Sequence, residues 1–460
     1  MTKLQATGNK IMTKLFVTNT LSRKKEEFKT LVEKKVSLYA CGVTPYDYSH
    51  IGHGRSFINI DVMVRFLRFL DFDVRYIRNI TDIDDKLLKK AEEAGDISSY
   101  KEIADKFIKS TEEELAKLNC LKPDEEPKVT EHIPQIITFI EQLIEKKKAY
   151  AVDGDVYFDV TSFDGYGKLS GRKLEDMISG ARVDVNEKKK NPADFALWKG
   201  NNKELFWNSP WGYGRPGWHI ECSVLVKEFL GESIDIHCGG LDLIFPHHEN
   251  ELAQSESLHG KTFAKYWLHN ALLNIDKEKM SKSLGNILSL HEVFSKKDPM
   301  ILRFYFLQHH YRMPIEFSFE VLDSAEVAYK KIVRACENAE KKENSILIAG
   351  DDRLNNCSFI QEMITALSDD FNTPKMLGVL FEHLDELKKS LACASVVRLF
   401  LNQILGLTLD SIQKVTLTPE IKKLIKEREI ARSEKNWAIA DTIRERLNEL
   451  GYESQDKKLK

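Results

Sequence analysis

The stretch 39–56, YACGVTPYDYSHIGHGRS, decides the fold because it runs from a strand through a glycine-bearing turn into a helix. The run 36–43 (VSLYACGV) is short and apolar, as expected for a buried parallel strand. Apolar side chains then recur at helical spacing over 55–70, and 73–80 (DVRYIRNI) is a second strand candidate. Strand, turn, helix and strand in this order form a βαβ unit. This unit predicts an α/β fold with a Rossmann-type doubly wound sheet.

The remainder of the chain changes character twice. The segment PDEEP at 123–127 opens a region, 123–217, of polar helices followed by loops rich in glycine, lysine and tryptophan. We interpret this region as an insertion into the sheet domain. The run SIDIH at 233–237 and a helix opening at Pro246 resume the α/β pattern. Beyond about residue 320 the sequence shows amphipathic stretches and no strand signal, which predicts a helical bundle.

The chain of 460 residues is too long for one compact core, so we expect several domains. Its composition, 42% hydrophobic and 30% charged, is that of a soluble globular protein. The predicted parts are an N-terminal extension 1–14, a Rossmann-type domain 15–320 carrying the insertion 123–217, a helical bundle 321–405 and a small C-terminal domain 406–460. Within the last part, 419–460 reads as two helices that meet near Asn436.

Composition also bears on where the protein works. The longest apolar stretch, 62–72, is interrupted by Arg65 and Arg68 and cannot span a bilayer. The first 24 residues lack the shape of a secretory signal. The seven cysteines are odd in number and scattered, which favours reduced thiols in a cytoplasmic protein. A net charge of −3 gives no whole-chain sign of nucleic-acid binding, so any RNA contact must come from local patches.

Two separated motifs suit phosphate chemistry. The sequence HIGH at 50–53 lies between the first strand and its helix, where a helix N-terminus offers free backbone N–H groups to phosphates. Glycine there lets the backbone come close, and two imidazoles can hydrogen-bond phosphate oxygens. Far downstream, KMSKS at 279–283 places two lysines among small residues, which suits closing on a triphosphate. Taken singly, a His-rich turn is more often a structural histidine pair, and a Lys/Ser stretch more often a solvated loop.

Four further side chains form a zinc-compatible set. His247 and Glu251 are four residues apart in the helix predicted to open at Pro246, so they share one helical face. Cys41 ends the first strand, and Cys222 lies in the segment GWHIECS. If the sheet brings these ends together at its carboxyl edge, the four side chains reach one ion. Spacing alone leaves an alternative open, in which both cysteines are buried small apolar residues and the helix face is merely charged.

The two phosphate motifs, in this order, resemble the HIGH and KMSKS signatures of class I aminoacyl-tRNA synthetases. Three stretches, YACGVTPYDYSHIGHGRS, SPWGYGRPGWHIECS and FPHHENELAQSE, resemble cysteinyl-tRNA synthetases specifically. The similarity runs from about residue 15 into the C-terminal segment. It implies a Rossmann-type catalytic domain with a connective insertion, a helical bundle and a small C-terminal anticodon-binding domain.

The resemblance also assigns roles to individual residues. It implies one zinc ion per chain, held by Cys41, Cys222, His247 and Glu251. The implied catalytic residues are His50, His53, Lys279 and Lys282. The implied ATP-binding residues are His50, Gly52, His53, Gly239, Gly240, Asp242, Lys279 and Lys282. The residues implied to enclose the amino acid are Gly42, Thr81 and Trp218. We expect a second layer that orients the ligands to include His219, His237, Cys238 and His248.

These roles imply an enzyme that activates L-cysteine with ATP and Mg²⁺ and then charges the 3′-terminal adenosine of tRNA(Cys). Serine differs from cysteine by one atom, but soft zinc prefers a thiolate to a hydroxyl. One such contact supports roughly the 10⁴–10⁵ discrimination that otherwise demands editing, so the insertion 123–217 need not be an editing domain. Because the substrate sulfur would be a fifth ligand, Glu251 is expected to be the weakest. We expect a monomer in the cytoplasm with no membrane association.

Two alternatives remain open at this point. A ligase that joins cysteine to an amino sugar, as in mycothiol synthesis, resembles the same catalytic half but needs no anticodon-reading end. The segment 421–460, with eleven Lys/Arg against eight Asp/Glu, argues against it. A zinc-stabilised RNA-binding protein without catalysis would have no use for the KMSKS stretch.

The C-terminal segment carries the expected tRNA contacts. Trp437 lies at the junction of two short helices, where an aromatic side chain more often packs the corner and less often stacks on an unpaired base. Arg432 and Asp441 supply a cation and a carboxylate suited to base edges, and 428–441 resembles the family's anticodon-binding segment. Asp456 is assigned to the same surface. Related chains often continue with a Gly-Thr-Thr-Trp-like tail that is absent here, which predicts more salt-sensitive and less base-specific binding.

Overall fold

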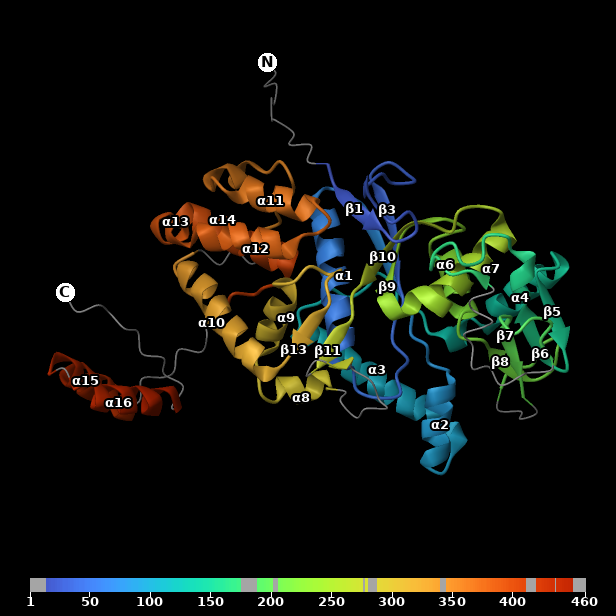
Figure 1. Ribbon diagram of the computed structural model, residues 1–460, viewed down its shortest axis with the longest axis horizontal. Helices are drawn as coiled ribbons and strands as arrows, with labels where there is room; N and C mark the ends of the chain where they lie inside the picture. Colours follow the sequence, from blue (N-terminus) through green and yellow to red (C-terminus); the bar gives the residue numbers. More distant parts are fainter. Residues whose placement is uncertain are drawn as a thin grey trace, which may run out of the picture. The chain divides into compact units, whose positions relative to one another are not determined.

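The computed structural model describes residues 14–174, 188–201, 206–275, 278–279, 288–339, 345–410, 419–434 and 436–449. The chain forms two compact units, residues 1–408 and 409–460. A four-stranded parallel sheet lies at the centre of the first unit (Figure 1). Its order is β10-β9-β3-β4, with bounds β3 (Lys35–Ala40), β4 (Asp73–Arg78), β9 (Ile234–Gly240) and β10 (Ala264–Asn270). The predicted α/β fold class is therefore confirmed.

The first βαβ unit joins β3 to β4 through α1 (Ile51–Phe69). This helix begins four residues before its predicted start, because two histidines cap its first turn. His50 Nδ1 accepts the N–H of His53 at 3.2 Å, and the His53 ring accepts the N–H of His50 at 3.4 Å. Strand β3 ends earlier than predicted, at Ala40, so Cys41 lies in the turn beyond the strand.

Helices cover the sheet and share one hydrophobic core with it. Their bounds are α2 (Asp85–Glu93), α3 (Tyr100–Lys117), α4 (Ile133–Glu145), α6 (Ile220–Phe229) and α7 (Glu249–His259). Helix α4 packs against both α6 and α7. Trp267 of β10, Phe139 of α4 and Trp198 of the insertion are fully buried in this core. Burying each such side chain stabilises the fold by roughly 1.5–3 kcal/mol.

The insertion contains a second sheet that the sequence analysis did not predict. Four antiparallel strands lie in the order β5-β6-β7-β8, with bounds β5 (Ala149–Val152), β6 (Asp155–Phe158), β7 (Phe195–Gly200) and β8 (Gly214–Pro216). The region was interpreted as helices and loops, and this is wrong for the strands. They are only three to six residues long, too short for a clear alternation of polar and apolar side chains.

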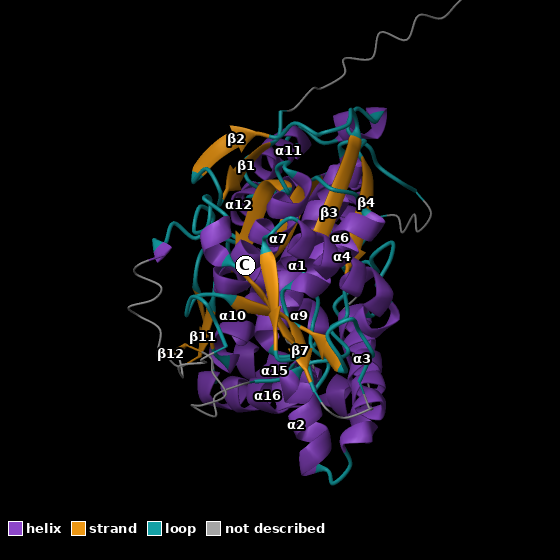
Figure 2. Ribbon diagram, turned by 90° about the vertical axis from the view of Figure 1, so that its right-hand side faces the viewer, coloured by secondary structure: helices purple, strands orange, loops and turns teal. Residues whose placement is uncertain are grey.

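Two smaller sheets flank the central one. The hairpin of β1 (Phe16–Asn19) and β2 (Lys24–Glu27) adjoins β10, where Thr20 N–H donates to the Trp267 carbonyl at 2.9 Å. A sheet in the order β12-β11-β13 is made of β11 (Leu273–Ile275), β12 (Glu278–Lys279) and β13 (Ile315–Phe317). In the views of Figures 1 and 2, β11 lies below β1. Helices α8 (Leu290–Phe294) and α9 (Pro299–Leu307) lie between β12 and β13 in the chain.

The helical bundle follows, and the part of it that the structure describes contains no strand after β13. Its helices are α10 (Phe319–Ala335), α11 (Ile360–Ser368), α12 (Thr373–Glu382), α13 (Leu384–Lys389) and α14 (Leu391–Leu405). Helix α14 packs against α1, where the rings of Phe69 and Phe400 meet edge to face at 5.5 Å. A buried ion pair between Arg303 and Asp61 joins α9 to α1.

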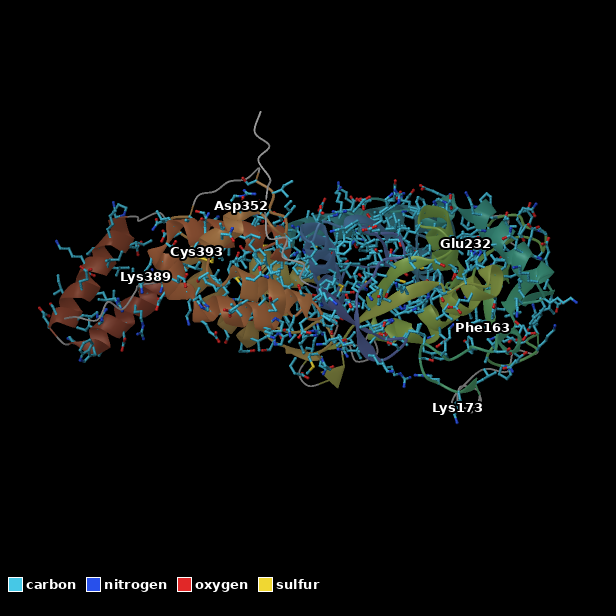
Figure 3. All side chains as sticks on the ribbon, turned by 90° about the horizontal axis from the view of Figure 1, so that it is seen from above. Phe163, Lys173, Glu232, Asp352, Lys389 and Cys393 are labelled. Carbon is cyan, nitrogen blue, oxygen red and sulfur yellow. A yellow bond between two sulfur atoms is a disulfide. The ribbon has the colours of Figure 1, made fainter. Side chains whose placement is uncertain are left out.

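One expectation about the cysteines is wrong. Cys357 and Cys393 form a disulfide within the bundle, with their Cα atoms 4.5 Å apart, whereas all seven thiols were expected to be reduced. The two residues are separated by 36 positions, so only the packing of the bundle reveals that they are neighbours. Figure 3 labels Cys393, toward the opposite end of the first unit from Phe163 of the insertion.

The second unit is a helical hairpin of α15 (Pro419–Ser433) and α16 (Trp437–Glu449). The helices meet where predicted, and Asn436 N–H donates to the carbonyl of Ala431 at 2.8 Å. The buried residues Ala431 and Ala440 are small enough to let the two helices approach closely. Across the whole described part of the chain, no helix is both long and apolar enough to cross a bilayer.

Candidate active site and metal centre

A cavity of about 360 Å³ lies at the carboxyl ends of the parallel strands. Parallel pairing brings the residues that follow β3, β4 and β9 to one edge of the sheet. The predicted site residues that line it are Cys41, Gly42, His50, Gly52, His53, Thr81, Trp218, Cys222, Gly239, Gly240, Asp242 and His247. Residues separated by up to about 200 positions in the sequence therefore share one cavity.

The predicted metal ligands form a compact cluster. One ligand atom from each of Cys41, Cys222, His247 and Glu251 lies within 4.8 Å of all the others. The two sulfurs are 3.9 Å apart, and His247 Nε2 lies 3.6 Å from Cys222 Sγ and 3.0 Å from Glu251 Oε1. Two thiols, an imidazole and a carboxylate are a donor set that suits zinc. The residues present therefore fit the ion that the sequence analysis expected.

The local backbone around His247 differs from the prediction. The helix was expected to open at Pro246, but α7 begins at Glu249, and His247 lies in a π turn, 244–248, before it. Phe245 is extended, with φ −138° and ψ 131°, so the chain cannot run as one regular helix here. His247 and Glu251 nevertheless remain close, as their spacing predicted.

A second layer of histidines surrounds the cluster. His237 Nε2 lies 2.8 Å from Glu251 Oε2, His248 Nε2 lies 3.2 Å from Cys41 Sγ, and His219 Nδ1 lies 2.9 Å from His247 Nδ1. His269, which the sequence analysis missed, extends the network, 2.8 Å from His248 Nδ1. Its position at the carboxyl end of the parallel strand β10 was the available signal. Cys41, His237, His248 and Glu251 form an overlapping second donor set.

Burial controls the protonation of these groups. It lowers the pKa values of His219 and His269 to about 3 and those of His247 and His248 well below their usual value. The imidazoles are therefore neutral at pH 7 and can act as ligands. Burial also raises the pKa of the Cys41 thiol well above its usual range. A cation at this position would favour the thiolate instead.

The wall of the cavity beside the cluster is built by hydrogen bonds that the sequence did not reveal. Trp218 is 39% exposed and stacks on His247, with ring centroids 4.4 Å apart. Asn79 accepts the N–H of Gly42 at 2.9 Å and donates to Thr81 Oγ1 at 3.0 Å, and Thr81 donates to Glu221 at 3.2 Å. Burial raises the pKa of Glu221 well above its usual range.

The comparisons with known proteins agree with the residues gathered here. Family models match the chain in three places, as "tRNA synthetases class I (C) catalytic domain" over residues 27–327, "DALR domain" over 362–409 and "Cysteinyl-tRNA ligase anticodon binding domain" over 415–458. The cysteine–tRNA ligase of Geobacillus thermodenitrificans is 47% identical over 95% of this chain and 96% of its own length. That of Bacillus pumilus is 44% identical over the same shares. The chain belongs to the cysteine–tRNA ligase family.

Solved structures support the fold of this family member. The methionyl-tRNA synthetase of Mycobacterium tuberculosis, in complex with methionyl-adenylate, aligns with a TM-score of 0.57 at 13% identity. The alignment covers 81% of this chain and 92% of that chain. At such low identity the likeness shows the class I synthetase fold alone.

In this synthetase, the motif HIGH forms the first turn of α1 at the cavity. The His50 and His53 rings stack with centroids 3.5 Å apart. The N–H of Ile51 donates to the carbonyl of Leu288 at 3.0 Å, so two of the first-turn N–H groups, those of Ile51 and His53, already bind protein acceptors. These two N–H groups are therefore not among the free donors that the sequence analysis expected at this helix N-terminus. The Lys279 backbone lies in β12, whereas its side chain and the whole of Lys282 lie outside the described residues.

Two glycines at the end of β9 leave room for neighbours. A Cβ atom on Gly239 would lie 2.5 Å from the His248 ring, and one on Gly240 would lie 2.4 Å from Asp242 Oδ1. Glycine is required at 239, where the buried His248 ring occupies the space, whereas the exposed Asp242 carboxylate could turn away from a side chain at 240.

The predicted tRNA residues lie in the second unit. Trp437 is the first residue of α16 and is 55% exposed, Asp441 pairs with Arg444 at 3.2 Å, and Arg432 is half-buried. Trp437 is thus largely open, whereas corner packing would have buried it. Asp456 lies outside the described residues.

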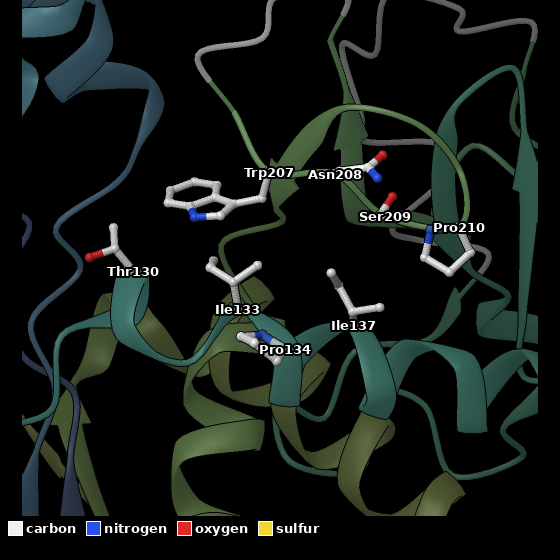
Figure 4. A pocket seen from close by; sticks show the side chains of 8 residues that line it. All are labelled: Thr130, Ile133, Pro134, Ile137, Trp207, Asn208, Ser209 and Pro210. Atoms are coloured by element: carbon white, nitrogen blue, oxygen red, sulfur yellow. The ribbon is translucent and has the colours of Figure 1, made fainter.

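A second hollow, of about 780 Å³, lies on the insertion (Figure 4). It is lined by Thr130, Ile133, Pro134, Ile137, Trp207, Asn208, Ser209 and Pro210. None of these lining side chains titrates near neutral pH, so the hollow offers no general acid or base. The chemistry belongs to the cavity at the sheet edge.

Proposed function

We propose that this protein activates L-cysteine with ATP and transfers it to the 3′-terminal adenosine of tRNA(Cys). In the first step a carboxylate oxygen of cysteine attacks the α-phosphorus of Mg²⁺-bound ATP, the bond to the β-phosphate oxygen breaks, and pyrophosphate leaves. In the second step a terminal ribose hydroxyl attacks the carbonyl carbon of cysteinyl-adenylate. The ester forms, the hydroxyl loses its proton, and AMP leaves.

The observation that carries this proposal is the cluster of Cys41, Cys222, His247 and Glu251, the first three of which line the cavity. It points to a substrate whose side chain prefers a soft metal, which among the amino acids favours the thiol of cysteine. When bound there, zinc would hold the substrate sulfur as a thiolate in preference to the hydroxyl of serine. The second-layer histidines would keep the imidazole and the carboxylate in place.

The remaining cavity residues would bind different parts of the two small substrates. Trp218 and Thr81, with Gly42, would enclose the amino acid beside the cluster. Gly239, Gly240 and Asp242, which line the cavity at the end of β9, would border the adenosine. His50, Gly52 and His53 would face the phosphates, with Lys279 and Lys282 neutralising the departing pyrophosphate.

Transfer to tRNA requires a part that recognises the RNA. The match of 415–458 to an anticodon-binding domain and the exposed Trp437 support base stacking by the second unit, with Arg432, Asp441 and Asp456 contributing polar contacts. An amino-sugar ligase of the mycothiol type has no use for this unit. A binder without catalysis does not agree with the family of the catalytic domain.

The proposal is tested by ATP–pyrophosphate exchange with each amino acid in turn. We expect exchange with cysteine and a rate with serine lower by at least about 10⁴-fold in kcat/KM. Comparable exchange with serine, or exchange driven by another amino acid and not by cysteine, would contradict the proposed substrate. Methionine is a suitable control, since its thioether cannot form a thiolate.

A further inference from the structure

Arg55 is a buried cation without a buried anion. It lies in α1, two residues after His53, and is 1% exposed. In the described part of the chain, no carboxylate oxygen lies within 4.0 Å of its guanidinium. Arg303, which is also fully buried, has Asp61 as its ion-pair partner. A buried charge is costly unless it is paired or has a use, so Arg55 calls for an explanation.

The partners of Arg55 are backbone carbonyls from two different segments. Nη1 donates to the carbonyls of Ala271 and Leu272 at 2.9 Å each, and Nη2 donates to His310 at 3.4 Å and to Met313. The first segment leads from β10 into β11, and the second leads from α9 into β13. A planar guanidinium with several N–H donors can bind two chain segments in this way, whereas the point charge of lysine cannot.

The segment that Arg55 fixes continues directly into the KMSKS strand pair. Leu272 precedes β11, and β11 pairs with β12 so that Asn274 lies opposite Lys279. On the far side of the motif the chain returns to the same helix, where Leu290 N–H donates to the carbonyl of Ser49 at 2.8 Å. Gly54 is also required there, since a Cβ atom on it would lie 2.8 Å from Leu290 Cδ2. The start of α1 therefore holds both flanks of the motif.

Arg55 also belongs to the cavity itself, together with His50 and His53. Its Nε is buried and has no hydrogen-bond partner within the described ranges of the chain. Burial lowers its pKa only to about 10, so the side chain remains a cation at neutral pH. A cation without a carboxylate partner among the described residues raises the potential of the phosphate end of the cavity.

We propose that Arg55 is a positioning residue of the phosphate site, which fixes the start of β11 against α1 and leaves its positive charge available to an anion in the cavity. The inference rests on the proposed function in one respect, since it takes the anion to be the triphosphate of ATP. The two roles are separable, because the backbone contacts need the guanidinium fork whereas the potential needs only the charge.

Two substitutions separate these roles, with Arg68→Gln as the matched control. Arg68 lies on the same helix and pairs with Asp124 at the surface, at 3.1 Å. Equilibrium dialysis of Mg²⁺–ATP without an amino acid measures ATP affinity, which reports the effect of the charge. We expect Arg55→Gln to weaken ATP binding at least tenfold, and Arg55→Lys and Arg68→Gln to change it less than threefold.

Rapid-quench measurement of the rate of adenylate formation at saturating ATP reports the positioning role. We expect Arg55→Lys to slow this step at least tenfold with unchanged affinity for cysteine.

The outcomes decide between the proposal and a purely structural role. Wild-type ATP affinity in Arg55→Gln would overturn the electrostatic part, and a wild-type rate of adenylate formation in Arg55→Lys would overturn the positioning part. Circular dichroism would show whether Arg55→Gln folds. If it does not, a more than threefold loss of ATP affinity in the charge-preserving Arg55→Lys would overturn the electrostatic part. A wild-type adenylate rate in the same variant would overturn the positioning part. The dialysis arm needs no cysteine, so a wrong assignment of the amino acid would leave its result intact.

Discussion

At the scale of single residues, the cavity depends on groups whose protonation is set by burial. His247 and His248 are neutral because a charged imidazole would lose its hydration, and the Cys41 thiol keeps its proton for the same reason. The site is thus prepared for a cation that accepts neutral nitrogen and displaces protons from sulfur. Metal binding should release protons and should weaken as the pH falls.

Replacing Cys222 by serine tests the cluster directly. We expect Cys222→Ser to lose the zinc ion and at least about 99% of cysteine-dependent exchange, because a hydroxyl is a poor ligand for a soft ion. Elemental analysis of freshly purified protein measures the metal. Cys336→Ser, at a buried thiol in the bundle, is the control and should keep one zinc per chain. Full metal content and full activity in Cys222→Ser would exclude this residue as a ligand.

Glu114 predicts a pH dependence of stability outside the site. Burial raises its pKa from 4.5 to about 7. Because the folded pKa is the higher one, the contribution to stability is complete below pH 4.5 and is lost as the pH rises to 7. Above pH 7 the ionised carboxylate lowers the free energy of unfolding by roughly 1–3 kcal/mol. Glu114→Gln should recover this stability.

Urea denaturation at pH 5 and pH 8 measures this difference. We expect the difference in free energy of unfolding between Glu114→Gln and wild type to be more favourable to the variant at pH 8 than at pH 5. Glu113→Gln, at the exposed neighbouring position, should show no such change. Parallel pH dependences for wild type and Glu114→Gln would show that Glu114 titrates normally.

At the scale of elements, the junction between β3 and β4 sets the geometry of the site. Gly42 lies so close to β4 that a Cβ atom on it would be 1.6 Å from the carbonyl oxygen of Asn79. The two strand ends would have to separate to accept any side chain. Since Cys41 precedes this glycine and Thr81 follows Asn79 by two residues, such a movement would displace both a proposed ligand and the wall of the amino-acid site.

Gly42→Ala is therefore expected to lower the free energy of unfolding by about 2–4 kcal/mol and to reduce zinc content and exchange activity. Gly378→Ala is the matched control, because that glycine lies inside α12 with no atom within 4 Å of the added Cβ. It should stabilise the protein by roughly 0.5–1 kcal/mol. Chemical denaturation of both variants compares them, and equal stabilities would contradict the close approach of the strands.

The elements also show how far the sequence could predict this molecule. Periodicity and turn chemistry predicted β3, α1, β4 and the terminal hairpin. Spacing alone left open whether Cys41 and Cys222 meet, and the family resemblance implied the pairing that the structure shows. The short strands of the insertion show no clear alternation of polar and apolar side chains. The disulfide between Cys357 and Cys393 depends on packing within the bundle. His269 and Asn79 were missed because one histidine or asparagine at a strand end has no motif. Only the sheet order brings them to the site.

At the scale of the whole molecule, catalysis and recognition of tRNA are assigned to different units. The cavity lies wholly in the first unit, and the match to an anticodon-binding domain covers 415–458. Deleting 419–460 should therefore leave cysteine-dependent exchange within about twofold of wild type. The same deletion should reduce kcat/KM for tRNA charging by at least roughly 10²-fold, since anticodon contacts supply several kcal/mol of binding.

Trp437→Ala is a finer version of this experiment. Loss of one base stack should cost about 1–3 kcal/mol of tRNA binding with no change in exchange. The exposed Ile439 offers a control on the same helix, and Ile439→Ala should change tRNA affinity little. A deletion variant that charges tRNA as well as the full chain would show that the second unit does not recognise the anticodon.

The most direct test of the central claim is the charging of tRNA(Cys) by the 460-residue protein supplied with zinc. Radiolabelled cysteine, ATP with Mg²⁺ and the tRNA are incubated with the enzyme, and acid-precipitable label is measured over time. The account predicts cysteine attached to tRNA(Cys), with no label attached when serine replaces cysteine. Cysteine-dependent pyrophosphate exchange without any charging of tRNA(Cys) would contradict it, and would indicate that the activated cysteine has a different acceptor.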